Sequence, residues 1–153
     1  GISLSCPAQV ARADVLGHGD FKPSNVLLHD GAAVFIDFEL AGPNYRGYDI
    51  FKLFRTNEMA PASDAELLRF IAVYLAEGGA DSGDAEAARC LAESKLFEPL
   101  TWLEAAIFFE FAAARLPEKR DEMRDLARDR WAAYEAVAGA DFDRSVADLR
   151  RLL

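Results

Sequence analysis

Residues 16–37 read LGHGDFKPSNVLLHDGAAVFID, and this stretch decides the fold of the chain. It contains two carboxylates and an amide: Asp20 and Asn25 share one polar loop, and Asp37 follows the apolar run AVFI. The turn sequence HDG at 29–31 separates two apolar runs, which is typical of a β-hairpin because glycine tolerates positive φ. The stretch therefore predicts a strand, a polar loop and a hairpin whose second strand is buried and ends beside the loop.

These side chains suit phosphoryl transfer from ATP. The reaction needs metal ions that bridge the phosphates and a group that orients the attacking hydroxyl, with little covalent help from the protein. An Asp can accept the hydroxyl proton, while an Asn oxygen and a second Asp can bind Mg²⁺, which prefers oxygen ligands. The loop pattern Asp-x-x-x-x-Asn, followed by a strand ending in Asp-Phe, supplies these groups in order. The sequence therefore predicts the catalytic core of a phosphotransferase.

The same residues resemble a known family. HGDFKPSNVLL at 18–28 is similar to the catalytic loop of kinase-like phosphotransferases, and VFIDF at 34–38 is similar to their metal-binding strand. Gly19 stands where protein kinases have Arg, and Glu39 stands where they have Gly. The continuation FELAGPNYRGYDI at 38–50 resembles the run found in choline and ethanolamine kinases, within the aminoglycoside phosphotransferase and protein-kinase-like superfamily.

The resemblance implies roles for the residues of the loop and strand. Asp20 would be the catalytic base, Lys22 would face the phosphates, and Asn25 and Asp37 would be the Mg²⁺ ligands. The alternative is that these are turn and strand-end residues of an unrelated α/β protein, because Asp and Asn favour turns. The order and spacing of the two motifs favour the catalytic interpretation.

Further residues are expected to support the loop or to bind the acceptor. By the resemblance, His18 would pack beneath the loop and Asp49 would brace it through backbone hydrogen bonds. A quaternary ammonium is held best by aromatic faces with a carboxylate nearby. The candidates for contact with such a substrate are Glu39, Tyr45, Trp102 and Glu104. The alternative for the last two is a helix at 100–116 that packs in the core, with its aromatic residues as filler.

Composition limits the other possibilities. The chain has 153 residues and a net charge of −9, which argues against nucleic acid and anionic membranes as partners. No apolar stretch has the length that a membrane span needs. Cys6 and Cys90 lack metal or redox spacing, so we expect reduced thiols in a cytoplasmic protein. The length fits a single domain with a substantial core.

The rest of the chain is expected to be helical after a bend at 42–44, so the fold class is α+β and mostly α. Ser63 and Glu66 form a capping-box pattern that opens a helix. Pro117 is well placed to open another, since its missing N–H costs nothing there. The first expected helix begins near residue 47. Further helices are expected over 63–77, 84–97, 100–116, 118–138 and 141–153, of which 100–116 is expected to be the most buried.

The resemblance covers only the C-terminal lobe of a kinase. Upstream of Leu16 the sequence has neither a Gly-rich phosphate-covering loop nor a strand with a nucleotide-binding Lys, so we expect the chain to lack the N-terminal lobe. The implied reaction is phosphorylation of a small cationic alcohol, choline or ethanolamine, as in phospholipid biosynthesis, with ATP and Mg²⁺ as cofactors. The alternatives are an aminoglycoside or other small-molecule kinase, and a non-catalytic half-kinase that serves as a binding module.

Overall fold

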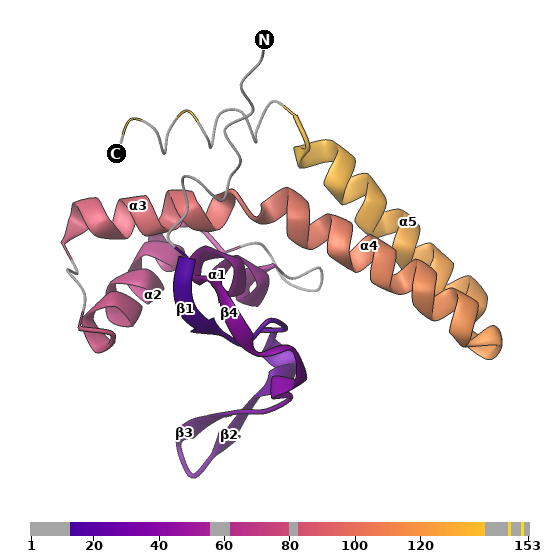
Figure 1. The fold of residues 1–153 in the computed structure, drawn as a ribbon, viewed down its shortest axis with the longest axis horizontal. Coiled ribbons are helices and arrows are strands. Elements are labelled where there is room, and N and C mark those ends of the chain that lie inside the picture. The colour runs from indigo at the N-terminus through magenta and orange to yellow at the C-terminus, as the bar shows by residue number, and fades with distance from the viewer. Residues whose placement is uncertain (1–12, 56–61, 80–82, 140–146, 148–150, 152–153) are drawn as a thin grey trace.

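The computed structural model describes residues 13–55, 62–79 and 83–139, together with 147 and 151 (Figure 1). The fold is α+β and mostly helical, as the sequence predicts. The strands are β1 (Ala13–Gly17), β2 (Val26–His29), β3 (Ala32–Phe35) and β4 (Gly42–Tyr45). The helices are α1 (Arg46–Phe54), α2 (Asp64–Glu77), α3 (Asp84–Lys95), α4 (Glu98–Arg115) and α5 (Arg120–Val137). Short 3₁₀ helices are labelled η2 (Pro23–Asn25), η3 (Phe38–Leu40) and η4 (Pro117–Lys119).

The strands form two antiparallel pairs, β2 with β3 and β1 with β4. The β2–β3 hairpin is confirmed: Val26 pairs with Phe35, and the turn places Asp30 and Gly31 at φ values of 49° and 78°. The prediction that β3 is buried is wrong, because all four of its residues are exposed. The hairpin projects from the body of the molecule, and no described element covers it (Figure 1).

The bend expected at 42–44 is instead strand β4. Its backbone pairs with β1, so that Gly42 lies opposite Gly17 and Pro43 opposite Leu16. Gly and Pro disfavour strands locally, and the pairing comes from a partner far away in the sequence. Proline is tolerated here because β4 is an edge strand of a two-stranded sheet.

Helix α1 is the central element, since it contacts β1, β4, α3 and α4. The core forms where α1, α2 and α3 meet, around the fully buried Ile71 and Cys90. The capping box of α2 is confirmed: the backbone N–H of Ser63 donates to Glu66 Oε2 at 2.8 Å, and the Glu66 N–H donates to Ser63 Oγ at 3.3 Å. The helices predicted near 47 and over 84–97 correspond to α1 and α3.

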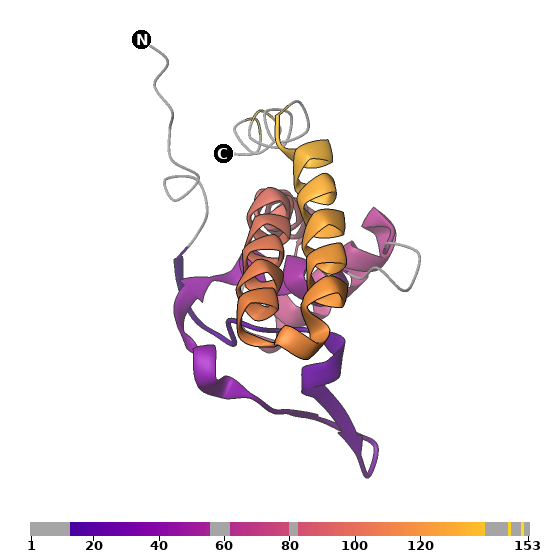
Figure 2. The ribbon, with the colours of Figure 1, turned by 90° about the vertical axis from the view of Figure 1, so that its right-hand side faces the viewer.

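Helices α4 and α5 lie side by side as an antiparallel pair (Figure 2). Small residues let them approach closely, and the buried alanines are Ala105, Ala106, Ala112, Ala113 and Ala127. The prediction that α4 is the most buried helix is wrong, because Ile107, Phe108 and Phe111 are exposed. Among the described residues, only one side of α4 is therefore covered by other elements, and part of its apolar surface stays exposed.

Pro117 opens a 3₁₀ turn that leads into α5, as its position predicts. The helix predicted over 141–153 and Cys6 lie outside the described residues, apart from positions 147 and 151. None of the helices in the described part of the chain has the length and apolar character that a membrane span requires.

Candidate active site

The polar loop follows β1, and its backbone depends on a glycine. Gly19 has φ of +81°, and a Cβ there would overlap the carbonyl oxygen of Leu40. Asp49, on the first turn of α1, accepts hydrogen bonds from the backbone N–H of His18 at 2.6 Å and of Gly19 at 3.0 Å. The α1 carboxylate thus holds the start of the loop at a fixed position against the helix.

His18 is buried beneath the loop. Its Nε2 lies 2.8 Å from the carbonyl oxygen of Ile36, and its ring lies 4.7 Å from that of Phe38 and 5.7 Å from that of Phe21. Ile36 directly precedes Asp37, so this imidazole connects the loop to the segment that carries the second carboxylate.

Asp20 is surrounded by cations and an amide. Lys22 Nζ lies 2.5 Å from its Oδ2, Lys52 Nζ lies 3.1 Å from its Oδ1, and Asn25 Nδ2 donates to Oδ2 at 3.3 Å. Burial by itself raises the pKa of Asp20, but the hydrogen bonds from Lys22 and Lys52 outweigh it and lower the pKa below the usual value. Asp20 is therefore ionised at neutral pH and can accept a proton.

Asn25 is linked by a backbone hydrogen bond to Ile36, the residue that directly precedes Asp37. The N–H of Ile36 donates to the Asn25 carbonyl oxygen at 3.1 Å. Asn25 is buried, and its side-chain amide nitrogen donates hydrogen bonds to the backbone carbonyl oxygen and to Oδ2 of Asp20. Its Oδ1 therefore remains available as an acceptor. Asp37 is exposed and adopts a left-handed conformation with φ of 68°. Two oxygen donors of this kind fit Mg²⁺.

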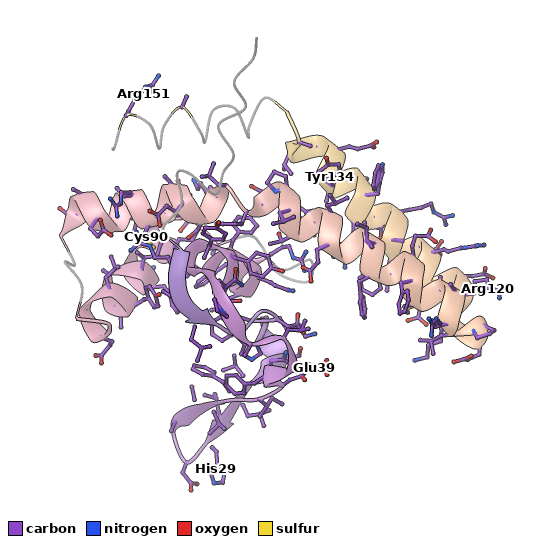
Figure 3. The ribbon with its side chains drawn as sticks, in the orientation of Figure 1. His29, Glu39, Cys90, Arg120, Tyr134 and Arg151 are labelled. Atoms are coloured by element: carbon purple, nitrogen blue, oxygen red, sulfur yellow. The ribbon has the colours of Figure 1, made fainter. Side chains whose placement is uncertain are left out.

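The residues predicted to contact the acceptor do not form one cluster. Glu39 extends from η3 into solvent (Figure 3), and the Tyr45 ring packs 5.5 Å from Phe97. Trp102 lies on α4, and the guanidinium of Arg55, at the end of α1, lies 4.9 Å from the centre of its ring. Glu104, two residues further along α4, pairs with Lys52, which also contacts Asp20.

Glu104 is brought close to Asp20 by Lys52. Lys52 Nζ donates to Glu104 Oε1 at 2.8 Å and Oε2 at 3.0 Å, and the Tyr48 hydroxyl donates to Glu104 Oε2 at 3.0 Å. Burial lowers the pKa of Lys52, but its hydrogen bonds with Glu104 more than offset this effect, so the pKa is raised and the ammonium keeps its charge. The predicted carboxylate is thus present near the site but is already neutralised by a lysine.

Comparison with protein families matches residues 4–90 to the phosphotransferase enzyme family. The matched segment covers more than half of the chain and includes the polar loop, Asp37 and Asp49. The chain belongs to this phosphotransferase enzyme family. The comparisons with curated proteins and with solved structures found no match. Membership of the family implies a kinase-like phosphotransferase activity. The acceptor candidates on α4, Trp102 and Glu104, lie outside the matched segment.

Three residues at the site of this phosphotransferase are not predicted from the sequence. Lys52 contacts Asp20 directly, Tyr48 contacts Glu104, and Arg55 covers the Trp102 ring. A signal for Lys52 was available, because it interrupts the apolar run IFKLF at 50–54 on a helix that packs in the core. No local pattern indicated its partners, which lie on the loop and on α4.

Proposed function

We propose that this phosphotransferase transfers the γ-phosphoryl group of ATP to a hydroxyl of a small molecule, with Asp20 as the base. The observation that carries the proposal is the geometry at Asp20, where two ammonium groups and an amide contact the carboxylate oxygens. A group of this kind can orient an attacking hydroxyl and accept its proton, which is what phosphoryl transfer requires of a base.

Access to Asp20 for a hydroxyl depends on which of its partners can move. Lys22 is 46% exposed, whereas Lys52 is only 4% exposed. Exposed ion pairs are weak, so we propose that Lys22 releases Oδ2 to the hydroxyl and contacts phosphate oxygens instead. Lys52 keeps its contact with Oδ1 and holds the carboxylate in place.

ATP and Mg²⁺ are the cofactors that we propose. Asn25 Oδ1 and the Asp37 carboxylate would hold the metal; the contacts of Asn25 with Asp20, and the hydrogen bond that ties Ile36 to Asn25 just before Asp37, support this assignment. The chemistry that these two residues would bring to the site by holding Mg²⁺ is neutralisation of the negative charge on the phosphate oxygens. His18 and Asp49 would keep the loop and Asp37 in register, as their backbone contacts suggest.

For the acceptor we propose a small amino alcohol, choline or ethanolamine, on the resemblance of residues 18–50 to kinases that act on those substrates. The aromatic residues of α4, Trp102 among them, are the groups that would receive an ammonium.

A neutral polyhydroxylated acceptor is a second candidate, and two contacts favour it. Arg55 and Arg130 lie 4.9 and 5.9 Å from the Trp102 ring centre, so cations already flank that ring. The carboxylate of Glu104, the other predicted acceptor contact on α4, is paired with Lys52. An added cation would meet repulsion from both arginines here, whereas a neutral alcohol would not.

The test is transfer of labelled phosphate from Mg²⁺-ATP to choline, ethanolamine, an aminoglycoside and a neutral sugar alcohol. We expect transfer to one acceptor class and a loss of at least about 100-fold for Asp20→Asn, which removes the base. Asp84→Asn, an exposed change at the start of α3, is the matched control and should be fully active. Near-normal transfer by Asp20→Asn would reject Asp20 as the base.

A second measurement addresses the metal. Calorimetric titration with nucleotide should show that Asp37→Ala weakens the Mg²⁺-dependent part of binding, while Asp84→Ala does not. Unchanged binding would remove Asp37 from the metal site. If the folded protein transfers phosphate to no acceptor in the panel yet binds nucleotide, the chain acts as a binding module and the catalytic proposal fails.

A further inference from the structure

We infer that Lys52 is a positioning residue that fixes the carboxylate of Asp20 and couples it to Glu104 on α4. The inference rests on the proposed role of Asp20 as the base. It goes beyond the family assignment, because it depends on contacts that join the loop and α1 to a helix outside the matched segment.

The ammonium of Lys52 lies at the junction of three elements. Its Nζ lies 3.1 Å from Asp20 Oδ1 and 3.2 Å from the carbonyl oxygen of Gly19, both in the loop. On the other side it lies 2.8 Å from Glu104 Oε1 and 3.4 Å from the Tyr48 hydroxyl. An ammonium has three N–H donors, and these acceptors satisfy all of them.

Burial makes this lysine different from the other cation at Asp20. Lys52 has 4% of its side-chain surface exposed, while Lys22 has 46%. A buried ammonium cannot leave its carboxylates without losing hydrogen bonds that water does not replace, whereas an exposed one exchanges with solvent at little cost. Lys52 is therefore the cation that still holds the Asp20 carboxylate when Lys22 moves into solvent.

Glu104 provides the second anchor. It holds Lys52 through both of its oxygens and accepts a further hydrogen bond from Tyr48, so its position is set although 39% of its side chain is exposed. Its exposed part lies within reach of solvent and of any ligand on that side of α4. Glu104 and Lys52 thus form a continuous chain of contacts from α4 to Asp20.

Removing the ammonium should affect turnover more than nucleotide binding. In Lys52→Met, the Asp20 carboxylate loses the partner of Oδ1 and faces Glu104 without a cation between them. Because small misplacements of reacting groups are costly, we expect kcat to fall by about 10- to 100-fold. The KM for ATP should stay within about twofold, because the proposed metal ligands Asn25 and Asp37 do not contact Lys52. Lys52→Arg should recover part of kcat.

The kinetic comparison includes two further variants. Lys95→Met breaks an exposed ion pair with Asp64 (2.7 Å) between α3 and α2, and should leave kcat and KM unchanged. Glu104→Gln keeps the shape of the anchor but removes its charge, and should lower kcat by less than Lys52→Met does. The double variant Lys52→Met with Glu104→Gln should have a kcat only slightly below that of Lys52→Met, because both changes remove the same contact.

A spectroscopic arm tests the contact without catalysis. In protein with ¹³C-labelled lysine, the Lys52 Cε–Hε signal is identified by its absence in Lys52→Met. Asp20→Asn and Glu104→Gln should each shift this signal and leave the Lys95 signal in place, while Asp64→Asn should shift only the Lys95 signal. Thermal unfolding of each variant shows whether it is folded, and Glu104→Gln serves if Lys52→Met does not fold.

The outcomes separate the two proposals. A wild-type protein without transfer activity rejects the proposed function, and the Lys52 signal still shows whether the contact with Asp20 exists. An active wild-type protein with normal kcat in Lys52→Met overturns the inference about Lys52 alone. A Lys52 signal that responds to Glu104→Gln but not to Asp20→Asn overturns it as well.

Discussion

At the scale of single residues, two glycines with similar backbone angles have different surroundings. Gly19 has φ of +81° and Gly31 has φ of +78°, a region that costs an L-residue about 1–2 kcal/mol. A Cβ at Gly31 would meet no atom within 4 Å, whereas one at Gly19 would overlap the Leu40 carbonyl. A substitution at Gly31 therefore tests backbone strain alone, whereas one at Gly19 tests backbone strain together with steric overlap.

Gly19→Ala should lower the free energy of unfolding by about 3 kcal/mol, because overpacking adds to the cost of positive φ. Gly31→Ala is the matched control and should cost only about 1 kcal/mol. Urea unfolding followed by circular dichroism measures both. Equal losses for the two variants would show that the loop can move away from Leu40 without cost.

Cys90 predicts a dependence of stability on alkaline pH. Burial raises the pKa of its thiol from the ordinary value of 9.0 to about 11. As pH rises through this window the unfolded chain releases the proton first, so the native state binds more protons and the free energy of unfolding falls. The contribution is fully present below pH 9 and is lost by about pH 11, and it amounts to about 3 kcal/mol.

The measurement is urea unfolding of the wild-type protein and of Cys90→Ala at several pH values from 8 to 11. We expect the difference in unfolding free energy between the two proteins to shrink as pH rises. The Tyr74 pKa is also raised, mainly by burial, but this group is present in both proteins. A constant difference across the range would show that the thiol does not titrate differently in the folded state.

At the scale of elements, a buried ion pair connects the start of α1 to α3. Arg46 Nε donates to Glu93 Oε2 at 2.6 Å, and Arg46 Nη1 donates to Glu86 Oε1 at 2.9 Å. Burial acts to lower the pKa of Arg46, but the hydrogen bond to Glu93 outweighs it, and the pKa is raised. Because α1 carries Asp49 and Lys52, this pair helps to place both residues beneath the loop.

Arg46→Met should lower the free energy of unfolding by about 3 kcal/mol, since it leaves Glu93 buried with only the longer contact to Arg89 at 3.5 Å. The double change Arg46→Met with Glu93→Leu should recover much of this loss, because it removes both buried charges. Arg89→Met, at a more exposed position, is the control and should cost less than about 1 kcal/mol. A double variant as unstable as Arg46→Met would show that packing, and not the unpaired charge, sets the cost.

At the scale of the whole molecule, burial is distributed unevenly. The junction of α1, α2 and α3 contains Ile71 and Cys90, both fully buried, whereas every residue of β3 is exposed. Figure 3 shows Cys90 within the helical body and His29 at the far tip of the hairpin. Local opening of the hairpin therefore exposes little additional apolar surface, and opening of the helical core exposes much more.

Hydrogen exchange followed by mass spectrometry should resolve this difference. Amides at 26–35 should exchange at least about 100-fold faster than those at 67–75 and 87–94, which corresponds to about 3 kcal/mol in opening free energy. Bound Mg²⁺-nucleotide, if it engages Asp37, should slow exchange at 26–38. Equal protection of hairpin and core without ligand would contradict the burial pattern.

The sequence by itself determined the features that depend on neighbouring residues. The Asp-Gly turn specified the β2–β3 hairpin, Ser63 and Glu66 specified the start of α2, and Pro117 specified the turn before α5. The order of polar residues in the loop and strand also sufficed to indicate a phosphotransferase. These features are local, because turns and caps are fixed by φ preferences and by hydrogen bonds within a few residues.

Only the tertiary structure decided which residues meet and which are buried. Asp49 reaches the loop across 31 residues, and Lys52 reaches Glu104 across 52, and no periodic pattern reports contacts at such separations. The same limit explains the wrong predictions for β3, β4 and α4. An apolar run shows that burial is favourable, but the packing of distant elements determines whether a partner covers it.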